Sequence, residues 1–493
     1  ANNLRQSPLP VLERLEHYMK NNTLSAKKYN LISILYYAFY IIIALSLLIR
    51  QPLNNPPDEY NRFLIPSYIA EHGTLPNGYE ESIRIGGYGF SYAFQPILPY
   101  MIQGYAMRLV RFFTTSSDAL LYTARGVDFL SGLITAHMVL LLSRKWFSDK
   151  RFQYLFAFLA TFLPQSIFVH TYVNTDSCCM MSIVIMLYGL TRGLQENFSV
   201  SSCVCLSVGI ILCALSYYNA YGYILSCILL FGAHFLSYQS SKLHMDWKPF
   251  FKKGIFISVI VLSGIAWWFI RSAILYDGDF LGLKARQLCA SLYALPEFHP
   301  ETRITYQNQG YSLLGMLKES DFVNLSTLSF IGIYGPMTIT TSIWVYRFYK
   351  ALFLLGILAC VISGPVLCML KKVSPDTLYE KRPAFRVFYH INLIFCIAIP
   401  CFLSAWYSYT TDYQPQGRYI LPMLIPFCYY CIRGIQKGFF LLSALLKKPI
   451  RQTALNRCQT GICIALCILI LCCVTVTVYG YAFPYYEAHP TAI

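Results

Sequence analysis

The chain has 493 residues, of which 56% are hydrophobic and only 13% are charged, and its formal net charge is +16. Soluble globular domains carry about 25% charged residues. This composition therefore excludes most soluble protein classes and requires that much of the apolar surface face lipid. The basic surplus would suggest nucleic-acid binding in a soluble protein, but no zinc-finger spacing or basic helix accompanies it. In a membrane protein it is typical of cytoplasmic loops, so we expect no nucleic-acid partner.

Most of the 18 cysteines lie within or beside apolar runs, where a cysteine behaves as a small hydrophobe. No Cys-x-x-Cys pair repeats at the spacing of a zinc site. The sequence therefore favours neither a disulfide framework nor a metal centre, and we expect no cofactor.

Eleven runs of mostly apolar residues approach the length of about 20 residues that a membrane-spanning helix needs. They predict an all-α polytopic membrane protein with spans at 31–49, 119–143, 152–172, 176–194, 200–216, 220–237, 254–272, 344–370, 387–408, 420–443 and 459–480. A twelfth segment, 93–113, is ambiguous because it has prolines near its start and arginines near its end.

The positions of Lys and Arg decide how 93–113 is interpreted. If it does not span, the basic N-terminal arm and four basic loops share one side, which the positive-inside rule assigns to the cytoplasm. These loops lie at 144–151, 242–253, 371–386 and 447–457. We therefore predict that 93–113 is an interfacial helix on the outer face, that the N-terminus lies inside and that the C-terminus lies outside.

This topology predicts four regions. They are a cytoplasmic arm at 1–30, a seven-helix catalytic module at 31–272, an outer segment at 273–343, and C-terminal spans at 344–493 that include a short outer turn. A second outer segment, 50–118, lies inside the module. Long segments of this kind are usually functional, so we expect the chemistry on the outer face.

The outer segment begins with the most informative motif, NNPPDEYNRFLIPSYIAEHGTLP at 54–76. Asp58 and Glu59 follow two prolines directly after the first span. A partly desolvated carboxylate at the membrane surface can act as a general base on a hydroxyl, although an Asp-Glu pair in a loop is more often a solvated turn. Asp176, in YVNTDS, lies at the outer end of a span, where capping of the next helix is the alternative role.

Arginines lie at the same predicted face. Arg271 ends the seventh span and Arg418, in QPQGRYILP, opens the tenth. Either residue could anchor a helix end in the headgroups, yet a guanidinium also binds phosphate oxygens bidentately. Arg125 and Asp128 are three residues apart within a span and share a helical face. Such intramembrane charges indicate either a substrate groove or a structural pair.

Several motifs occur in a recognisable order: the PPDE loop, the Pro-rich FQPILPYMI, NTDS, WFIRSAILYDGDFLG, SFIGIYGPMTITTSIWVY and QGRY. Together they resemble the GT-C superfamily of integral-membrane glycosyltransferases, which includes protein O-mannosyltransferases and lipid A aminoarabinose transferases. They are most similar to a bacterial membrane-protein family in which the PPDE loop and QGRY recur together. The resemblance covers most of residues 30–443.

The resemblance implies a role for each matching residue. Asp58 would deprotonate the acceptor hydroxyl, Glu59 would assist it or position the acceptor, and Asp176 would support the site. Arg271 and Arg418 are the candidates for the donor phosphate. The remaining substrate-binding candidates are Gln416, Tyr419, Arg125 and Arg62. The chain lacks the Asp-x-Asp spacing of metal-dependent members, so the resemblance implies no metal.

The leading hypothesis is a transferase of the bacterial cytoplasmic membrane that works at the periplasmic face. It would move a sugar, with inversion, from a polyprenyl-phosphate donor to a lipid-linked glycan or lipopolysaccharide. An O-antigen-modifying glucosyltransferase would have this size and topology. The alternatives are a flippase of lipid-linked sugars, which would be expected to show inverted repeats, and an O-antigen polymerase or ligase.

Overall fold

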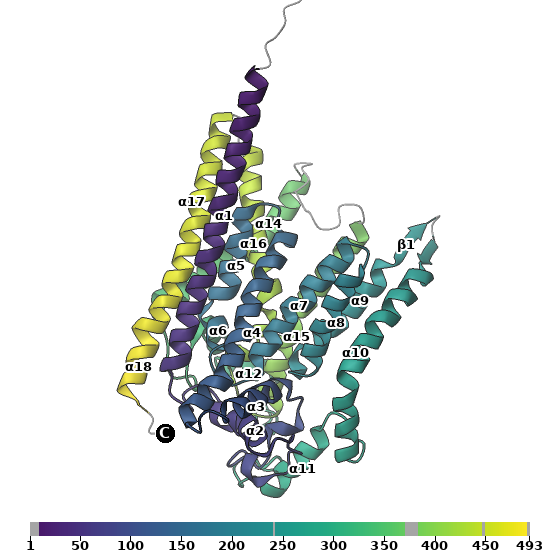
Figure 1. The fold of residues 1–493 in the computed structure, drawn as a ribbon, viewed down its shortest axis with the longest axis vertical. Helices are drawn as coiled ribbons and strands as arrows, with labels where there is room; N and C mark the ends of the chain where they lie inside the picture. The colour runs from purple at the N-terminus through teal and green to yellow at the C-terminus, as the bar shows by residue number, and fades with distance from the viewer. Residues whose placement is uncertain (1–8, 240–241, 370–382, 446–448, 491–493) are drawn as a thin grey trace, which may run out of the picture.

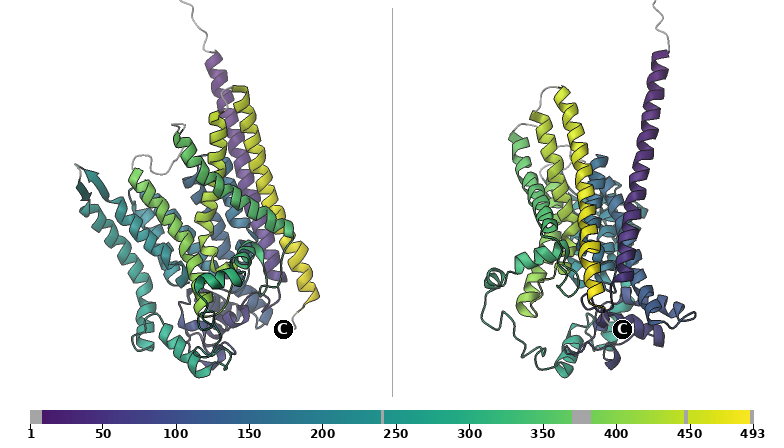
Figure 2. Two further views of the ribbon diagram at one scale, coloured as in Figure 1. Left: turned by 180° about the vertical axis from the view of Figure 1, so that it is seen from behind. Right: turned by 90° about the vertical axis from the view of Figure 1, so that its left-hand side faces the viewer.

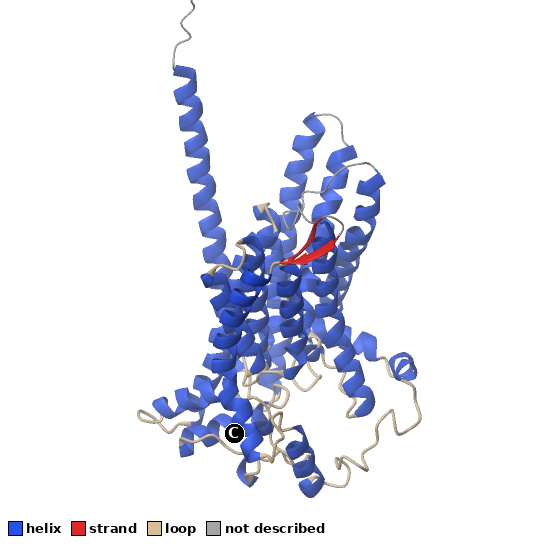
Figure 3. Cartoon of the chain, turned by 90° about the vertical axis from the view of Figure 1, so that its right-hand side faces the viewer, coloured by secondary structure: helices blue, strands red, loops and turns tan. Residues whose placement is uncertain are grey.

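In a computed structural model of the chain, the residues described are 9–239, 242–369, 383–445 and 449–490. This part of the chain is largely helical. One antiparallel hairpin joins strand β1 (Leu236–Gln239) to β2 (Lys242–Met245), and Leu236 pairs with Met245. Long helices run through a bundle, and short helices gather at one end of it (Figures 1 and 3).

The short elements define what we call the loop end of the bundle. Figure 1 shows α2, α3 and α11 together there, whereas α1 begins at the opposite end, which we call the arm end. The short helices are α2 (Glu59–His72), α3 (Leu98–Val110), α11 (Leu283–Tyr293), α12 (Leu313–Glu319) and α13 (Phe322–Gly332). The 3-10 turns are η1 (Glu81–Ile83), η2 (Tyr92–Phe94), η3 (Tyr218–Ala220), η4 (Gly417–Tyr419) and η5 (Leu421–Met423).

The bundle itself contains two groups of helices. The chain up to residue 275 provides α1 (Leu9–Arg50), α4 (Ser117–Trp146), α5 (Lys150–Phe162), α6 (Pro164–Phe168), α7 (Asp176–Gln195), α8 (Val200–Ala214), α9 (Tyr221–His234) and α10 (Trp247–Leu275). The second half provides α14 (Ile343–Met369), α15 (Pro383–Thr410), α16 (Leu424–Leu445), α17 (Pro449–Thr475), the π-helical η6 (Val476–Ala482) and α18 (Phe483–Ala488).

Seven of the described helical segments are long and apolar enough to cross a membrane. They are Asn30–Arg50, Ser117–Trp146, Asp176–Gln195, Trp247–Leu275, Ile343–Val366, Ala384–Thr410 and Thr453–Ala488. All seven overlap spans predicted from hydropathy. On α10 the apolar side chains of Ile255, Val259 and Leu262 are about 60% exposed. Apolar exposure on this scale would be unfavourable in water and is expected in lipid, so the prediction of an all-α polytopic membrane protein is confirmed.

The other four predicted spans are helical but shorter, interrupted or more polar. The 152–172 segment is broken between α5 and α6, because Leu163 leaves the helical region before Pro164. A residue before proline avoids the α conformation. The helices α8 and α9 have only 15 and 14 residues, and α16 carries Arg433 and Lys437. Hydropathy detected all four segments but overestimated their continuity.

The prediction that 93–113 does not span the bundle is confirmed, and its position at the outer membrane face stays a prediction. Its helical part, α3, lies with α2 at the loop end and does not cross the bundle (Figure 1). Pro99 occupies the first turn of α3, where its missing N–H leaves no hydrogen bond unmade. The two helices approach closely at Gly104, where an added Cβ would lie 2.6 Å from the Ile69 Cβ.

The two ends of the bundle differ in charge. Arg144 and Lys145 end α4 and Lys248 and Lys252 begin α10, and these helix ends lie at the arm end (Figure 1). The described chain finishes at the loop end, where the C-terminal label lies. This arrangement agrees with the predicted separation of basic loops from the acidic segment. The side of the membrane that each end faces stays a prediction.

The segment between α11 and α12 departs from the compact bundle. Residues 294–312 arch away from the other elements at the loop end (Figure 2). We call these residues the arch. They are tied back to the end of α15, because the Gln307 amide donates to the Tyr409 carbonyl (3.1 Å) and the Tyr409 hydroxyl donates to the Tyr311 carbonyl (2.8 Å).

Candidate active site

Asp58 occupies the turn that starts α2. Its backbone has φ +61°, and its side chain makes no capping hydrogen bond to the helix. Aspartate tolerates this left-handed conformation better than most residues. The carboxylate pairs instead with Arg418, whose Nη2 lies 2.5 Å from Oδ2, and Arg62 Nη2 lies 4.0 Å from the same oxygen. The turn therefore directs an acid toward two guanidinium groups.

Arg418 is held by a close contact between two stretches of backbone. The amide of Gly417 donates to Ser329 Oγ on α13 (2.8 Å). A Cβ at Gly417 would lie 2.0 Å from the backbone nitrogen of Phe330, so only glycine fits there. The following Arg418 is 1% exposed and also donates through Nη1 to the Pro57 carbonyl (3.1 Å).

Asp176 completes the group on the opposite side of Arg62. It is the first residue of α7, and its Oδ2 lies 3.6 Å from Arg62 Nη1. The Asn174 side chain, not Asp176, accepts the Ser177 amide at this helix start (2.8 Å). Asp176 thus faces a charged partner at the start of the helix. We call Asp58, Arg62, Asp176 and Arg418 the Asp58 cluster.

The cluster has unmet hydrogen-bonding capacity. The buried Nε atoms of Arg62 and Arg418 and the buried Oδ2 of Asp176 have no hydrogen-bond partner. Leaving a buried polar group unpaired costs about 1–3 kcal/mol, and native structures leave few such groups. Guanidinium N–H groups without acceptors indicate a site that takes an anionic or strongly polar ligand.

Electrostatics keep Asp58 ionised. Burial opposes its ionisation, but the charges of Arg418 and Arg62 outweigh burial and lower the pKa of the Asp58 carboxyl below its ordinary value. The Tyr92 hydroxyl adds to this effect. The Asp58 side chain is 36% exposed, whereas that of Arg418 is 1% exposed. Asp58 is therefore a carboxylate at neutral pH and the most accessible member of the cluster.

Glu59 points the other way, into the bundle. Its carboxylate receives Arg125 Nε at 2.7 Å and Nη2 at 2.6 Å, and both side chains are fully buried. Glu59 Oε1 also accepts the Val173 amide (3.0 Å). Arg125 Nη1 donates to the carbonyls of Leu48 (2.9 Å) and Gln51 (2.8 Å) at the end of α1. The pair ties α1, α2 and α4 together.

The other sequence candidates lie at different distances from the cluster. Tyr419 adjoins it, because Arg418 Nη2 donates to the Tyr419 hydroxyl (3.3 Å). Gln416 donates to Gln414 (2.5 Å), which lies one step further from the cluster. Arg271 donates to the Pro76 carbonyl (2.7 Å) and stacks on Trp268. The structure therefore does not bring Arg271 to Asp58.

Asp128, which shares a helical face with Arg125, has a partner of its own. Its Oδ2 accepts from Gln103 Nε2 on α3 (2.7 Å). The two ionisable residues of α4 therefore bind different elements of the loop end and do not pair with each other.

Tyr92 belongs to the site although it is not among the residues predicted from the sequence. The Arg62 guanidinium carbon lies 5.1 Å from the centroid of the Tyr92 ring. The signal in the sequence is the alternation of Tyr88, Phe90, Tyr92 and Phe94 in GYGFSYAF. In a chain with 40 tyrosines and 34 phenylalanines this pattern is easily overlooked.

A family model described as "Predicted membrane protein (DUF2142)" matches residues 68–426. This chain belongs to that family. The match includes Asp176 and Arg418, and it begins after Asp58 and Arg62. A comparison with curated proteins gives no match.

The fold is similar to those of two solved membrane enzymes. One is the archaeal oligosaccharyltransferase AglB from Archaeoglobus fulgidus in complex with an inhibitory peptide and a dolichol-phosphate, with 15% identity over 88% of this chain and a TM-score of 0.49. The other is ArnT from Cupriavidus metallidurans bound to undecaprenyl phosphate, with 12% identity over 91% of this chain and 76% of that chain, and a TM-score of 0.49. The chain spans 55% of the AglB chain.

Proposed function

We propose that this protein is a glycosyltransferase that moves a sugar from a polyprenyl-phosphate-linked donor to a hydroxyl of a glycan acceptor at the loop end. The Asp58 cluster carries the proposal. It combines an accessible carboxylate with two buried guanidinium groups that retain free N–H donors, on a helical bundle that lies in lipid. A lipid-linked phosphate sugar has chemistry that matches each part.

The reaction assigned to Asp58 is general-base catalysis. The acceptor hydroxyl gives its proton to the Asp58 carboxylate as its oxygen attacks the anomeric carbon of the donor. The bond between that carbon and the phosphate oxygen breaks, and its electron pair leaves with the polyprenyl phosphate. A single displacement of this kind inverts the anomeric configuration.

Arg62 and Arg418 would stabilise the departing phosphate. Guanidinium groups bind phosphate oxygens in a planar fork, and both residues have an Nε donor without a partner. A phosphate bound there would share the arginine charge that now stabilises the Asp58 carboxylate. The pKa of Asp58 would then rise toward that of a useful base, so donor binding itself would activate it.

We also propose an acceptor class, a donor lipid, a membrane orientation and roles for Asp176 and Arg271. The acceptor would be a lipid-linked glycan such as an O-antigen or lipopolysaccharide, and the donor lipid would be undecaprenyl phosphate. The loop end would face the periplasm of a bacterium with the N-terminus in the cytoplasm, as the basic arm end favours. Asp176 would hold Arg62 in place, and Arg271 would contact the donor only after a movement of the first outer segment.

The test uses the full chain, purified in lipid nanodiscs, with a radiolabelled polyprenyl-phosphate hexose and a lipid-linked glycan acceptor. The wild-type protein should move label to the acceptor. The Asp58→Asn variant should lose this activity while eluting and melting as the wild type does. Asp118→Asn, which changes an exposed acid on α4, is the matched control and should retain activity.

The same preparation separates the other function classes. A flippase would move the labelled lipid across vesicle membranes without changing the acceptor, and a polymerase or ligase would transfer whole glycans instead of one sugar. Either result, or full activity in a folded Asp58→Asn variant, would overturn the proposal.

A further inference from the structure

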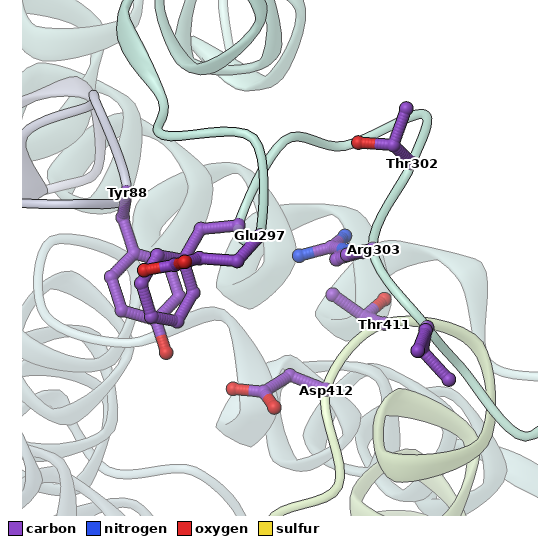
Figure 4. Close-up of a pocket in the computed structure, with 8 residues that line it drawn as sticks. Tyr88, Glu297, Thr302, Arg303, Thr411 and Asp412 are labelled. Carbon is purple, nitrogen blue, oxygen red and sulfur yellow. The ribbon is translucent and has the colours of Figure 1, made fainter.

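A cavity of about 320 Å³ lies at the loop end, next to the arch. Three segments that are far apart in the sequence line it: Tyr88 from the first outer segment, Phe298 and Arg303 from the arch, and Thr411 and Asp412 from the turn after α15. Figure 4 shows Tyr88 on one side of this space and Arg303 and Thr411 on the other.

The aromatic side of the cavity is a fixed platform. The Tyr88 and Phe298 rings have centroids 4.6 Å apart and planes 31° apart. Gly87 has φ +78°, and a Cβ there would lie 3.1 Å from the Phe298 ring. The Gly87 carbonyl accepts a hydrogen bond from the backbone amide of Leu295 (2.9 Å). An aromatic face has negative charge density that attracts weakly positive C–H groups, such as those on one face of a sugar ring.

Apart from Ile304, the remaining lining is polar and slightly acidic. Asp412 and Glu297 accept hydrogen bonds, Arg303 donates them, and Thr411 does both. Side chains of this kind match the hydroxyls of a saccharide. Two carboxylates against one guanidinium disfavour an anionic ligand, so the composition points to a neutral sugar instead of a phosphate or a uronic acid.

A row of aromatic side chains connects the cavity to the Asp58 cluster. From Tyr88 the ring centroids run to Phe90 (6.2 Å) and then to Tyr92 (6.2 Å), which stacks against Arg62 (5.1 Å). Burial raises the pKa of Tyr88, and the charges of Asp412 and Asp58 add to this effect. The Tyr88 hydroxyl therefore lies within electrostatic reach of both acids.

A second connection runs along the turn after α15. Gln414 donates to Asp412 (2.7 Å) and accepts from Gln416 (2.5 Å), two residues before Arg418. Two chains of contacts therefore connect residues of the cavity lining to the Asp58 cluster.

We propose that this cavity binds a neutral saccharide unit of the acceptor and orients the acceptor hydroxyl toward Asp58. The catalytic meaning of this binding rests on the glycosyltransferase function proposed above. Saccharide binding itself does not require that function, so the two proposals can fail separately.

Binding is measured first, on the full chain in nanodiscs, by saturation-transfer NMR. The probes are neutral di- to tetrasaccharides of common hexoses and N-acetylhexosamines, a glucuronate-containing trisaccharide, and a Ser/Thr-containing peptide. The wild type should bind a neutral member, and Tyr88→Ala and Asp412→Asn should each weaken that binding at least about tenfold. Tyr105→Ala and Asp118→Asn, which change exposed residues on α3 and α4, are matched controls and should bind as the wild type does.

The inference would be overturned if the wild type binds no neutral saccharide, prefers the glucuronate or the peptide, or binds equally well in folded cavity variants. If the cavity variants lose saccharide binding but the wild type transfers no sugar, the cavity assignment is supported and the proposed function is overturned.

Steady-state kinetics then tests whether the cavity orients the acceptor hydroxyl toward Asp58. The cavity variants should raise KM for the acceptor about tenfold or more, whereas KM for the donor and the slow hydrolysis of donor by water should not change. Transfer with an unchanged acceptor KM would leave the proposed function standing and overturn the cavity assignment.

Discussion

Asp58 and Glu59 are consecutive acids with opposite environments. Glu59 is fully buried and receives a bidentate arginine and a backbone amide. Asp58 is partly exposed, sits in a left-handed turn and faces arginines that retain unpaired N–H groups. The environment of Glu59 holds helices together, whereas that of Asp58 leaves hydrogen-bond donors that a ligand can use. Two identical functional groups thus differ in role because the helix begins between them.

Asp58→Asn should have the largest effect. It keeps the shape of the side chain but removes the base, and general-base catalysis typically contributes about 10²–10⁴-fold in rate. Transfer measured with labelled donor should fall by that factor while thermal stability stays within the range of the control Asp118→Asn. A melting temperature well below that of the Asp118→Asn control would mean that Asp58 has a structural role, as Glu59 does.

Glu59→Gln should instead damage the fold. It leaves Arg125 buried without a counter-charge, and breaking a buried ion pair costs about 3–5 kcal/mol. We expect a lower melting temperature in nanodiscs and poor membrane yield. The double variant Glu59→Gln, Arg125→Met should recover part of this loss. A stable single variant with lowered activity would move Glu59 into the catalytic group.

Arg62→Lys should have an intermediate effect. Lysine keeps the charge beside Asp176 but loses the planar fork, and a hydrogen bond to a charged group is worth about 1.5–3 kcal/mol. KM for the donor should rise roughly 10–100-fold. Arg271→Lys changes an arginine outside the cluster and serves as the comparison, with a smaller rise expected.

The pH dependence should give the smallest change. The pKa of Asp58 is lowered, so the carboxylate form is lost only when the pH falls below the ordinary value of about 3.9. The kcat/KM of the wild type should therefore be level between about pH 5 and pH 8 as far as Asp58 is concerned. The Arg418→Gln variant loses one of the positive charges that oppose the effect of burial, so the pKa of Asp58 should rise. The fall of kcat/KM at acidic pH should then begin at a higher pH than in the wild type. If kcat/KM falls at the same acidic pH in this variant as in the wild type, Arg418 does not control the ionisation of Asp58.

Much of the fold could be predicted because lipid imposes a strong pattern on the sequence. Hydropathy located every described span, and charge placed 93–113 at the loop end. The break at Pro164 shows what this pattern misses, because a run of apolar residues reports burial and not helix continuity. That break matters for the site, since the non-helical residues after α6 include Val173, whose amide binds Glu59.

The site could be predicted only in part. The acids and Arg418 were recognisable as candidates, but nothing in the residue types distinguishes Asp58 from Glu59. Their difference depends on one backbone angle and on an arginine 360 residues away. The cavity also lay outside sequence reasoning, because its lining comes from three segments that are far apart in the sequence.

The contact at Gly417 divides the loop end into a part that is hard to alter and a part that is not. Arg418 takes its position from the close packing of the η4 and α13 backbones and from the hydrogen bond between the Gly417 amide and Ser329 Oγ, so few of the surrounding side chains set its place. The arch, by contrast, contributes its lining through exposed or half-buried side chains on a segment outside the bundle. We expect that replacing arch residues retunes what the protein accepts while the charges around Asp58 stay where they are. A designer who wants a new acceptor should begin with residues 294–312.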